Sequence, residues 1–195
     1  MVVFIVNDFF MRMGFTKILK ELIYEQLDTS QFKRASELMA SQWYWDHIRA
    51  EEGLRCKAYD DGAGNLTIGY GHTEDVKKDD ILGDGENCKI EANDLLREDS
   101  THHANRLRNI FTTWEDQGLN ILITQGMFDA LLSLSYNGGS GGIRRSDVIS
   151  LLKTSQTIDK DKLYKAAESI KTYRISMKGH KGRREKEYKR FIEGL

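Results

Sequence analysis

Three polar residues have types and spacings that suit the cleavage of a glycosidic bond. Glu52 is followed nine residues later by Asp61, and Thr67 follows six residues after that. Such cleavage requires one carboxylic acid that protonates the leaving oxygen, and a second carboxylate that stays ionised to direct water or attack the anomeric carbon. A helix ending at Glu52 and a hairpin carrying Asp61 can hold this pair across a cleft, with Thr67 placed to hydrogen-bond the water.

A neighbouring acidic pair provides an internal test of this assignment. Glu51 and Asp60 have the same nine-residue separation, but the residue six positions after Asp60 is Leu66, which cannot hold a water. Gly53 directly follows the second glutamate and is a natural helix stop, so that glutamate stands at a helix end. The sequence therefore favours the first three residues, although a glutamate and an aspartate at this spacing more often lie on a solvated surface.

The surrounding elements predict an α+β fold, mostly helical with one small antiparallel hairpin. From 59 to 73 the chain combines DDGAGN, which is turn chemistry, with LTIGYG, in which β-forming residues alternate with glycines. Apolar residues at helical spacing predict helices on both sides of this hairpin, and residues 74–88 are expected to form a loop. The expected helices cover 16–27, 30–52, 89–110, 124–136, 146–154, 159–173 and 183–193.

Composition and charge indicate a globular chain whose basic residues gather near the C-terminus. The 195 residues are 39% hydrophobic and 30% charged, and no apolar run reaches the ~18 residues of a membrane-spanning helix. The opening MVVFIVNDFF has no basic region before it, so we interpret it as a packed strand or helix start rather than a secretory signal. Residues 144–195 carry fifteen basic and seven acidic side chains without interleaved aromatics, so we expect no nucleic-acid partner. An anionic polymer such as a bacterial wall fits this charge equally well.

The two cysteines, Cys56 and Cys88, are too few for a disulfide framework. They form no CxxC pair, so no metal site is expected. We expect two reduced, partly buried thiols, while a single bridge between them stays open as the alternative.

A long motif surrounds the three candidate residues. The segment 52–73, EGLRCKAYDDGAGNLTIGYGHT, contains Glu-x8-Asp-x5-Thr and continues as Thr-Ile-Gly-x-Gly-His. It resembles the signature of the phage-type muramidases, glycoside hydrolase family 24. Three later segments resemble that family in the same order: KIEANDLLRED, FDALLSLSYNGGSGGIRRSDVISLLK and GHKGRREKEYKRF. The resemblance covers about residues 48–193 and leaves residues 1–47 without a counterpart.

The resemblance implies a lysozyme-like fold and an N-acetylmuramidase that needs no metal or organic cofactor. Such an enzyme cuts the β-1,4 bond between N-acetylmuramic acid and N-acetylglucosamine. Glu52 would be the general acid, Asp61 would position or activate water, and Thr67 would help to hold that water. The family usually inverts configuration, which requires carboxyl groups far enough apart to admit a water. A lytic transglycosylase uses a single glutamate, so the presence of Asp61 and Thr67 argues against that alternative.

The same resemblance implies supporting residues and a cleft wall. His72 would pair with Asp99 and support the site rather than act as a base. Either Arg183 or Arg184 would lie near the general acid and tune it. A cysteine at position 56 and a histidine at position 180 depart from the family and affect local loops more than the chemistry. The positions that match the saccharide cleft of the family are Tyr136, Asn137 and Ser146.

The chain is expected to divide into a helical extension, residues 1–47, and a lysozyme-like domain, residues 48–195. The extension is amphipathic, and three roles stay open for it: docking on a phage tail or other assembly, self-association, or packing on the back of the enzyme. The enzyme would accordingly be an endolysin released from the host cytoplasm through a holin, or a virion-associated protein. Bacterial peptidoglycan is the expected partner in both cases.

Overall fold

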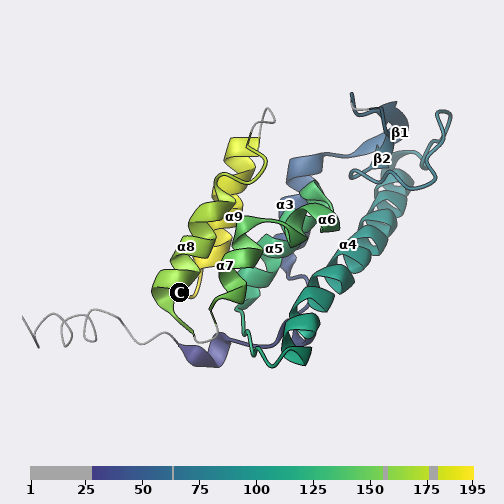
Figure 1. The fold of residues 1–195 in the computed structure, drawn as a ribbon. Helices are drawn as coiled ribbons and strands as arrows, with labels where there is room; N and C mark the ends of the chain where they lie inside the picture. The colour runs from purple at the N-terminus through teal and green to yellow at the C-terminus, as the bar shows by residue number, and fades with distance from the viewer. Residues whose placement is uncertain (1–27, 63, 156–157, 176–179) are drawn as a thin grey trace, which may run out of the picture.

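The computed structural model describes residues 28–195 except positions 63, 156–157 and 176–179. Over this part the chain forms two lobes that are joined by one long helix (Figure 1). The smaller lobe holds a two-stranded antiparallel sheet, and the larger lobe is helical. The expected α+β fold, mostly helical with one small hairpin, is confirmed. The helix expected at 16–27 lies outside the described residues.

The small lobe is built on a hairpin that turns through the glycine-rich segment. β1 (Arg55–Asp60) pairs antiparallel with β2 (Leu66–Gly69), and Tyr59 lies opposite Thr67. Glycines in the turn adopt positive φ, for example 82° at Gly62, which side chains on L-residues disfavour. The DDGAGN segment therefore supplies the turn that brings the two strands together.

The long connecting helix is α4 (Gly85–Asp116), which spans about 48 Å at the α-helical rise for its 32 residues. Its N-terminal part packs on β2, where Ala92 lies beside Gly69. Its C-terminal part enters the core of the large lobe through Leu107 and Phe111. α4 thus carries the small lobe at one end and the large lobe at the other (Figure 1). Among the described helices, α4 included, none is long and apolar enough to span a membrane.

The large lobe is arranged around α5 (Gln125–Gly138), in which every residue from Gly126 to Ser135 is buried. α9 (His180–Ile192) packs closely against it. A Cβ placed on Gly126 would lie 2.3 Å from the carbonyl oxygen of Arg190, so only glycine permits this approach. All five helices expected after the hairpin are present with shifted ends, and α6 is an addition. The shorter helices are α6 (Ser140–Arg144), α7 (Asp147–Lys153) and α8 (Lys160–Ile170).

The segment before the hairpin departs from the prediction. α3 (Gln42–Glu52) begins at residue 42, so the prediction of one helix over 30–52 is wrong for its first part. That part instead contains two short 3-10 turns, η1 (Thr29–Gln31) and η2 (Ala35–Glu37). Between them, Lys33 and Ile123 exchange two backbone hydrogen bonds of 2.9 Å. This long-range pairing holds the chain extended and overrides the local helical pattern.

Part of the segment expected to be an extension belongs to the core of the large lobe. Phe32, Ala35 and Leu38 are buried in the same hydrophobic cluster as the side chains of α5. The backbone N–H and the hydroxyl of Ser41 donate to the buried carboxylate of Asp129 at 3.1 and 2.6 Å. Residues 28–47 therefore pack on the body of the protein, while residues 1–27 lie outside the described part.

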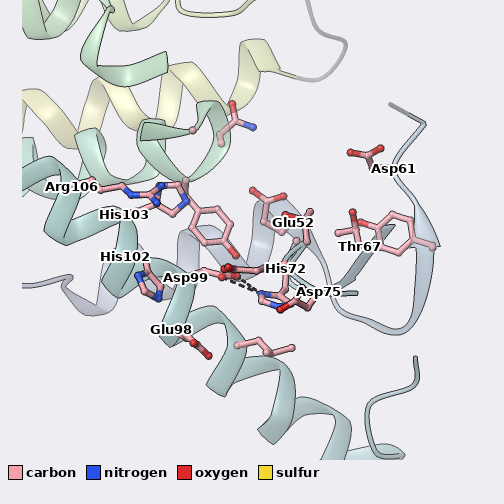
Figure 2. A pocket seen from close by; sticks show the side chains of 18 residues that line it. Glu52, Asp61, Thr67, His72, Asp75, Glu98, Asp99, His102, His103 and Arg106 are labelled. Atoms are coloured by element: carbon pink, nitrogen blue, oxygen red, sulfur yellow. Dashed lines mark hydrogen bonds and ion pairs between the residues drawn. The ribbon is translucent and has the colours of Figure 1, made fainter. Parts of the chain in front are cut away.

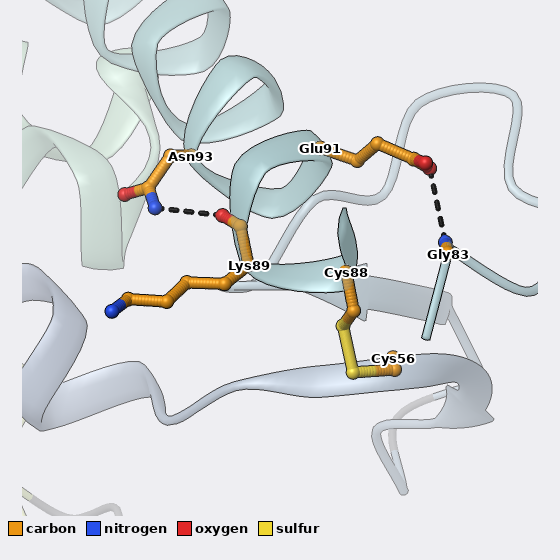
Figure 3. Close-up of a disulfide and its surroundings, with 6 residues drawn as sticks. All are labelled: Cys56, Gly83, Cys88, Lys89, Glu91 and Asn93. Atoms are coloured by element: carbon orange, nitrogen blue, oxygen red, sulfur yellow. Dashed lines mark hydrogen bonds between the residues drawn. A yellow bond between two sulfur atoms is a disulfide. The ribbon is translucent and has the colours of Figure 1, made fainter. Parts of the chain in front are cut away.

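Cys56 and Cys88 form a disulfide, so the expectation of two reduced thiols is wrong and the alternative holds (Figure 3). Cys56 lies on β1, and Cys88 lies near the start of α4. Their Cα atoms are 5.7 Å apart, which is the usual separation for a bridge. The sequence alone could not show this, because the pairing requires α4 to begin beside β1. The bridge fastens the hairpin to the long helix.

Candidate active site

A pocket of about 830 Å³ lies between the hairpin and the large lobe, with one wall formed by α4 (Figure 2). The three candidate residues all line it, although they come from different elements. The tertiary fold therefore brings together the residues that sequence spacing selected. The pocket is lined by Glu52, Tyr59, Asp61, Thr67, Gly71, His72, Thr73, Glu74, Asp75, Leu95, Glu98, Asp99, His102, His103, Arg106, Tyr136, Asn137 and Gly139.

Glu52 is the last residue of α3, as expected, and Gly53 ends the helix with a φ of 69°. Arg183 Nη1 donates to Glu52 Oε1 at 2.6 Å. Of the two arginines that the sequence left as candidates for lying near Glu52, Arg183 is therefore the one that contacts it. This ion pair fixes one carboxylate oxygen of Glu52. The other oxygen, Oε2, faces Gly71, where an added Cβ would lie 3.5 Å away. Because Gly71 also lines the pocket, Oε2 lies on the pocket side of the Glu52 carboxylate.

A buried carboxylate on α9 holds Arg183 in place. Glu187 is fully buried, and its Oε1 accepts from Arg183 Nε at 3.2 Å and from the Ser133 hydroxyl at 2.5 Å. Burial disfavours the charged form of Arg183, but Glu52 and Glu187 outweigh this effect and raise its pKa. Arg184 turns away from Glu52: its Nε lies 2.6 Å from Glu187 Oε2, and its Nη2 donates to Asn137 Oδ1 at 3.2 Å.

Asp61 and Thr67 come from the two ends of the hairpin turn. The Asp61 carboxylate accepts from the backbone N–H of Asn65 at 3.1 Å and from its Nδ2 at 2.9 Å. Thr67 lies on β2 and is only 4% exposed, so its hydroxyl is held at the pocket wall. In Figure 2, Asp61 and Thr67 lie on one side of Glu52, and the side chains of α4 lie on the other. The site thus has two carboxylates on separate elements facing one open volume.

His72 and Asp99 form a hydrogen-bonded pair at the pocket wall. His72 Nδ1 lies 3.0 Å from both carboxylate oxygens of Asp99, which joins the end of the hairpin to α4 (Figure 2). Burial raises the pKa of Asp99, and the contact with His72 opposes that shift. The contact fastens the hairpin lobe to α4 at a second point, beyond the disulfide.

Two of the three expected cleft residues reach the pocket, and the third does not. Tyr136 and Asn137, at the end of α5, both line it. The Tyr136 hydroxyl donates to the Tyr70 carbonyl at 2.8 Å, and burial raises its pKa. Ser146 is 6% exposed, precedes α7 and donates to the Ile143 carbonyl at 2.6 Å. Its hydroxyl is therefore engaged within the helical lobe, away from the pocket lining.

One face of α4 contributes side chains that the sequence analysis did not assign. Glu98, His102 and Arg106 recur every four residues, and this i, i+4 spacing was the available signal. His103 lies beside them, with Nδ1 3.0 Å from the Ser135 hydroxyl. Burial lowers the pKa of His103 to about 4, so its imidazole is neutral at neutral pH. Among the described residues no group of three or more His, Cys, Asp or Glu side chains is arranged to hold a metal ion.

Comparison with known proteins identifies the family. The sequence profile of the phage lysozyme family matches residues 49–187, which include the whole pocket lining. The chain belongs to the phage lysozyme family. Among its relatives, the endolysin of Bacillus phage PZA is 33% identical over 113 residues, which are 56% of this chain and 39% of that protein. The endolysin of Bacillus phage B103 is 32% identical over 154 residues, 75% of this chain and 51% of that protein.

The fold of the phage lysozyme family is also found among solved structures. The muramidase domain of SpmX from Asticaccaulis excentricus superposes with a TM-score of 0.63 at 24% identity, covering 80% of this chain and 98% of that domain. A mutant of P22 lysozyme gives a TM-score of 0.61, covering 80% of this chain and 99% of that one. The endolysin of Salmonella phage P22 is 30% identical over 109 residues, 54% of this chain. The chain spans only 39–66% of the length of the endolysins that it matches.

Proposed function

We propose that this protein is an N-acetylmuramidase that hydrolyses the β-1,4 bond between N-acetylmuramic acid and N-acetylglucosamine in peptidoglycan. One observation carries the proposal: Glu52, Asp61 and Thr67 face a single pocket, and Arg183 holds one oxygen of Glu52 at 2.6 Å. Membership of the phage lysozyme family supports the same reaction class. The proposed reaction uses no metal or organic cofactor.

In the proposed reaction, Glu52 is the general acid. The bond between the anomeric carbon of the muramic acid and the bridging oxygen breaks, and a proton moves from Glu52 to that oxygen. Because Arg183 occupies Oε1, the oxygen that carries this proton is Oε2, which faces Gly71 at the pocket wall. Once the proton has moved, Glu52 is left as a carboxylate, the form that pairs with Arg183.

Asp61 supplies the second carboxylate on the other side of the pocket. A water attacks the anomeric carbon, its oxygen forms the new bond, and Asp61 accepts its proton. Thr67, buried at the wall, orients this water through its hydroxyl. Attack from the face opposite the leaving group inverts the configuration, which is the outcome we propose. The Asn65 contacts at 3.1 and 2.9 Å hold the Asp61 carboxylate in place for this role.

Other residues position these groups or line the cleft. We assign Tyr136 and Asn137 to the saccharide-binding wall, since both line the pocket beside Glu52. His72 and Asp99 fasten the hairpin, and so the Asp61 side of the cleft, to α4. Arg184 steadies Asn137 through its 3.2 Å contact. Ser146 has no part in the proposal, because its hydroxyl is bonded within the helical lobe.

The names of the relatives support a role in host lysis. We propose that the protein acts on the host cell wall as an endolysin, reaching it from the host cytoplasm through a holin. A virion-associated enzyme docked through the N-terminal segment stays the alternative. Phe32, Ala35 and Leu38 pack on the protein itself, whereas exposed side chains of the same segment, such as Met39, are open to a partner. Lysis measured with and without a co-expressed holin separates the two settings, since a virion-borne enzyme needs none.

A peptidoglycan lysis assay with Glu52→Gln tests the proposed reaction. We expect a loss of at least about a hundredfold, because the variant cannot donate a proton. Glu51→Gln is the matched control, since Glu51 pairs with Lys186 at 2.7 Å outside the pocket lining and should be dispensable. Equal lysis by wild type and Glu52→Gln would overturn the proposal. Mass spectrometry of the products tests the alternative chemistry, because an anhydromuramic product would indicate a lytic transglycosylase.

A further inference from the structure

A polar stripe on α4 forms one wall of the pocket, and the proposed reaction does not use it. Glu98, His102 and Arg106 are all exposed and all line the pocket (Figure 2). Their spacing of four residues places them along one face of the helix. At the helical rise, Glu98 and Arg106 stand about 12 Å apart along the axis. The stripe is therefore acidic at one end and basic at the other.

Arg106 is the cationic end of this stripe. Its Nη1 donates to the Ser140 hydroxyl at 2.9 Å, which holds the guanidinium beside α6 at the edge of the pocket. None of the ion pairs found among the described residues includes Arg106. The neighbouring His103 is neutral at neutral pH, because burial lowers its pKa to about 4. Arg106 thus presents a guanidinium without a carboxylate partner to a pocket otherwise rich in acidic residues.

The substrate class proposed above contains a matching anion. In an intact glycan strand the lactyl carboxyl of each muramic acid is tied up in the amide bond to its stem peptide, so the sugars carry no charge. The free carboxylates belong to the stem peptides. A planar guanidinium binds carboxylates through paired, charge-assisted hydrogen bonds. Glu52 and Arg106 line the same pocket, so a stem peptide next to the bond that Glu52 is proposed to cleave has Arg106 on its pocket wall.

We propose that Arg106, with His102 beside it, forms a subsite for a carboxylate of the peptidoglycan stem peptide. This proposal rests on the proposed muramidase function and adds a specificity determinant to it. The subsite recognises the peptide branch of the substrate, whereas Tyr136 and Asn137 face its sugars. The acidic end of the stripe at Glu98 repels a carboxylate, which directs the anion towards Arg106.

Two forms of one substrate test the subsite. Soluble glycan strands with stem peptides are compared with the same strands after their carboxylates have been converted to amides by carbodiimide and ammonia. The kcat/KM for release of reducing ends is measured for wild type, Arg106→Gln and Arg97→Gln. Arg97 is the matched control, because it is exposed on α4, does not line the pocket and lies nine residues earlier, about half a turn out of phase. Ser140→Ala is a second variant that keeps the charge but removes the hydroxyl that Arg106 contacts.

We expect Arg106→Gln to lower kcat/KM on the untreated strands by about threefold to fivefold, the effect of a solvent-accessible ion pair. We expect no effect of this variant on the amidated strands and none of Arg97→Gln on either substrate. The difference should shrink as salt is raised, which a purely structural role does not predict. The subsite would be overturned if Arg106→Gln lowered kcat/KM equally on both substrates and Ser140→Ala did the same. It would also be overturned if Arg106→Gln lowered kcat/KM on neither substrate. If wild type releases no reducing ends from either substrate, the muramidase function itself fails, and the subsite with it.

Discussion

The disulfide gives a stability prediction whose size follows from its position in the chain. Cys56 and Cys88 are 32 residues apart, so the bridge closes a loop of that length in the unfolded chain. The chain-entropy relation for such a loop gives about 4 kcal/mol of stabilisation at 25 °C. Reduction should therefore lower the free energy of unfolding by about that amount. For a protein of this size the melting temperature should fall by roughly 8–16 °C.

The assay must detect the small lobe as well as the large one. The three tryptophans, at positions 43, 45 and 114, lie on α3 and near the end of α4, so their fluorescence reports mainly on the large lobe. We would follow denaturant unfolding by far-UV circular dichroism together with hydrogen exchange of the hairpin. The amides of Ile68 and His72 are suitable probes, because each donates to the other's carbonyl at 2.9 Å. Reduced wild type keeps both cysteine side chains. Its comparison with the oxidised protein therefore measures the effect of the cross-link alone, without a change in side-chain packing.

Two outcomes would refute this reasoning. An unfolding free energy of reduced wild type within about 1 kcal/mol of the oxidised protein would show that the bridge does not restrain the unfolded chain as the relation requires. Unchanged exchange at Ile68 and His72 on reduction would show that the hairpin does not depend on its covalent tie to α4. Cys56→Ser with Cys88→Ala should resemble the reduced protein, with a further loss because Cys88 is fully buried.

Three further predictions concern the large lobe and α4. Glu187→Gln should lower the free energy of unfolding by about 3–5 kcal/mol in denaturant titration, because the buried Arg184 loses its carboxylate partner and Arg183 keeps only Glu52. A loss below about 1 kcal/mol would contradict this. His103 has a pKa lowered from 6.5 to about 4, so the unfolded state binds the proton more readily, and stability should fall as pH drops from 6.5 to 4. After allowance for the partial exposure of His103, its contribution to this fall in the free energy of unfolding should be about 1–2 kcal/mol. Denaturant titration of wild type and His103→Gln at each pH should show the contribution in wild type and not in the variant. Gly126→Ala should lower the melting temperature markedly, because its Cβ would lie 2.3 Å from the Arg190 carbonyl oxygen; an unchanged melting temperature would show that α9 can move aside.

The parts of the fold that depend on local sequence were predictable. Glu52 at a helix end and the hairpin that follows could be derived because glycine and turn residues act over a few positions. The helices after the hairpin were predicted correctly because the apolar residues at helical spacing are the ones that are buried in the structure. The start of α3 was predicted wrongly, because the backbone bridge between Lys33 and Ile123 joins residues 90 positions apart in the sequence.

The parts of the site that depend on packing were not predictable. Arg183 and Arg184 are adjacent, and which one reaches Glu52 depends on how α9 is rotated against α5, about 100° per residue. Cys56 and Cys88 pair only because α4 begins beside β1. Ser146 matched a motif position, yet its hydroxyl bonds within its own turn. The i, i+4 spacing of Glu98, His102 and Arg106 marks one face of α4, but that this face lines the pocket depends on where the hairpin lies.

The ties between hairpin and helices have a consequence for the stereochemistry of the proposed reaction. Glu52 belongs to α3, whereas Asp61 belongs to the hairpin turn, so no local bond geometry sets the gap between the two carboxylates. That gap is set by long-range ties, among them the disulfide, the His72–Asp99 pair and the Tyr136 hydroxyl on the Tyr70 carbonyl. Inverting and retaining glycosidases differ by only a few ångströms in this gap. In the proposed muramidase reaction, the anomeric form of the product therefore depends on how the lobes are fastened. Substitutions at these fastenings are expected to alter it without removing any reacting group.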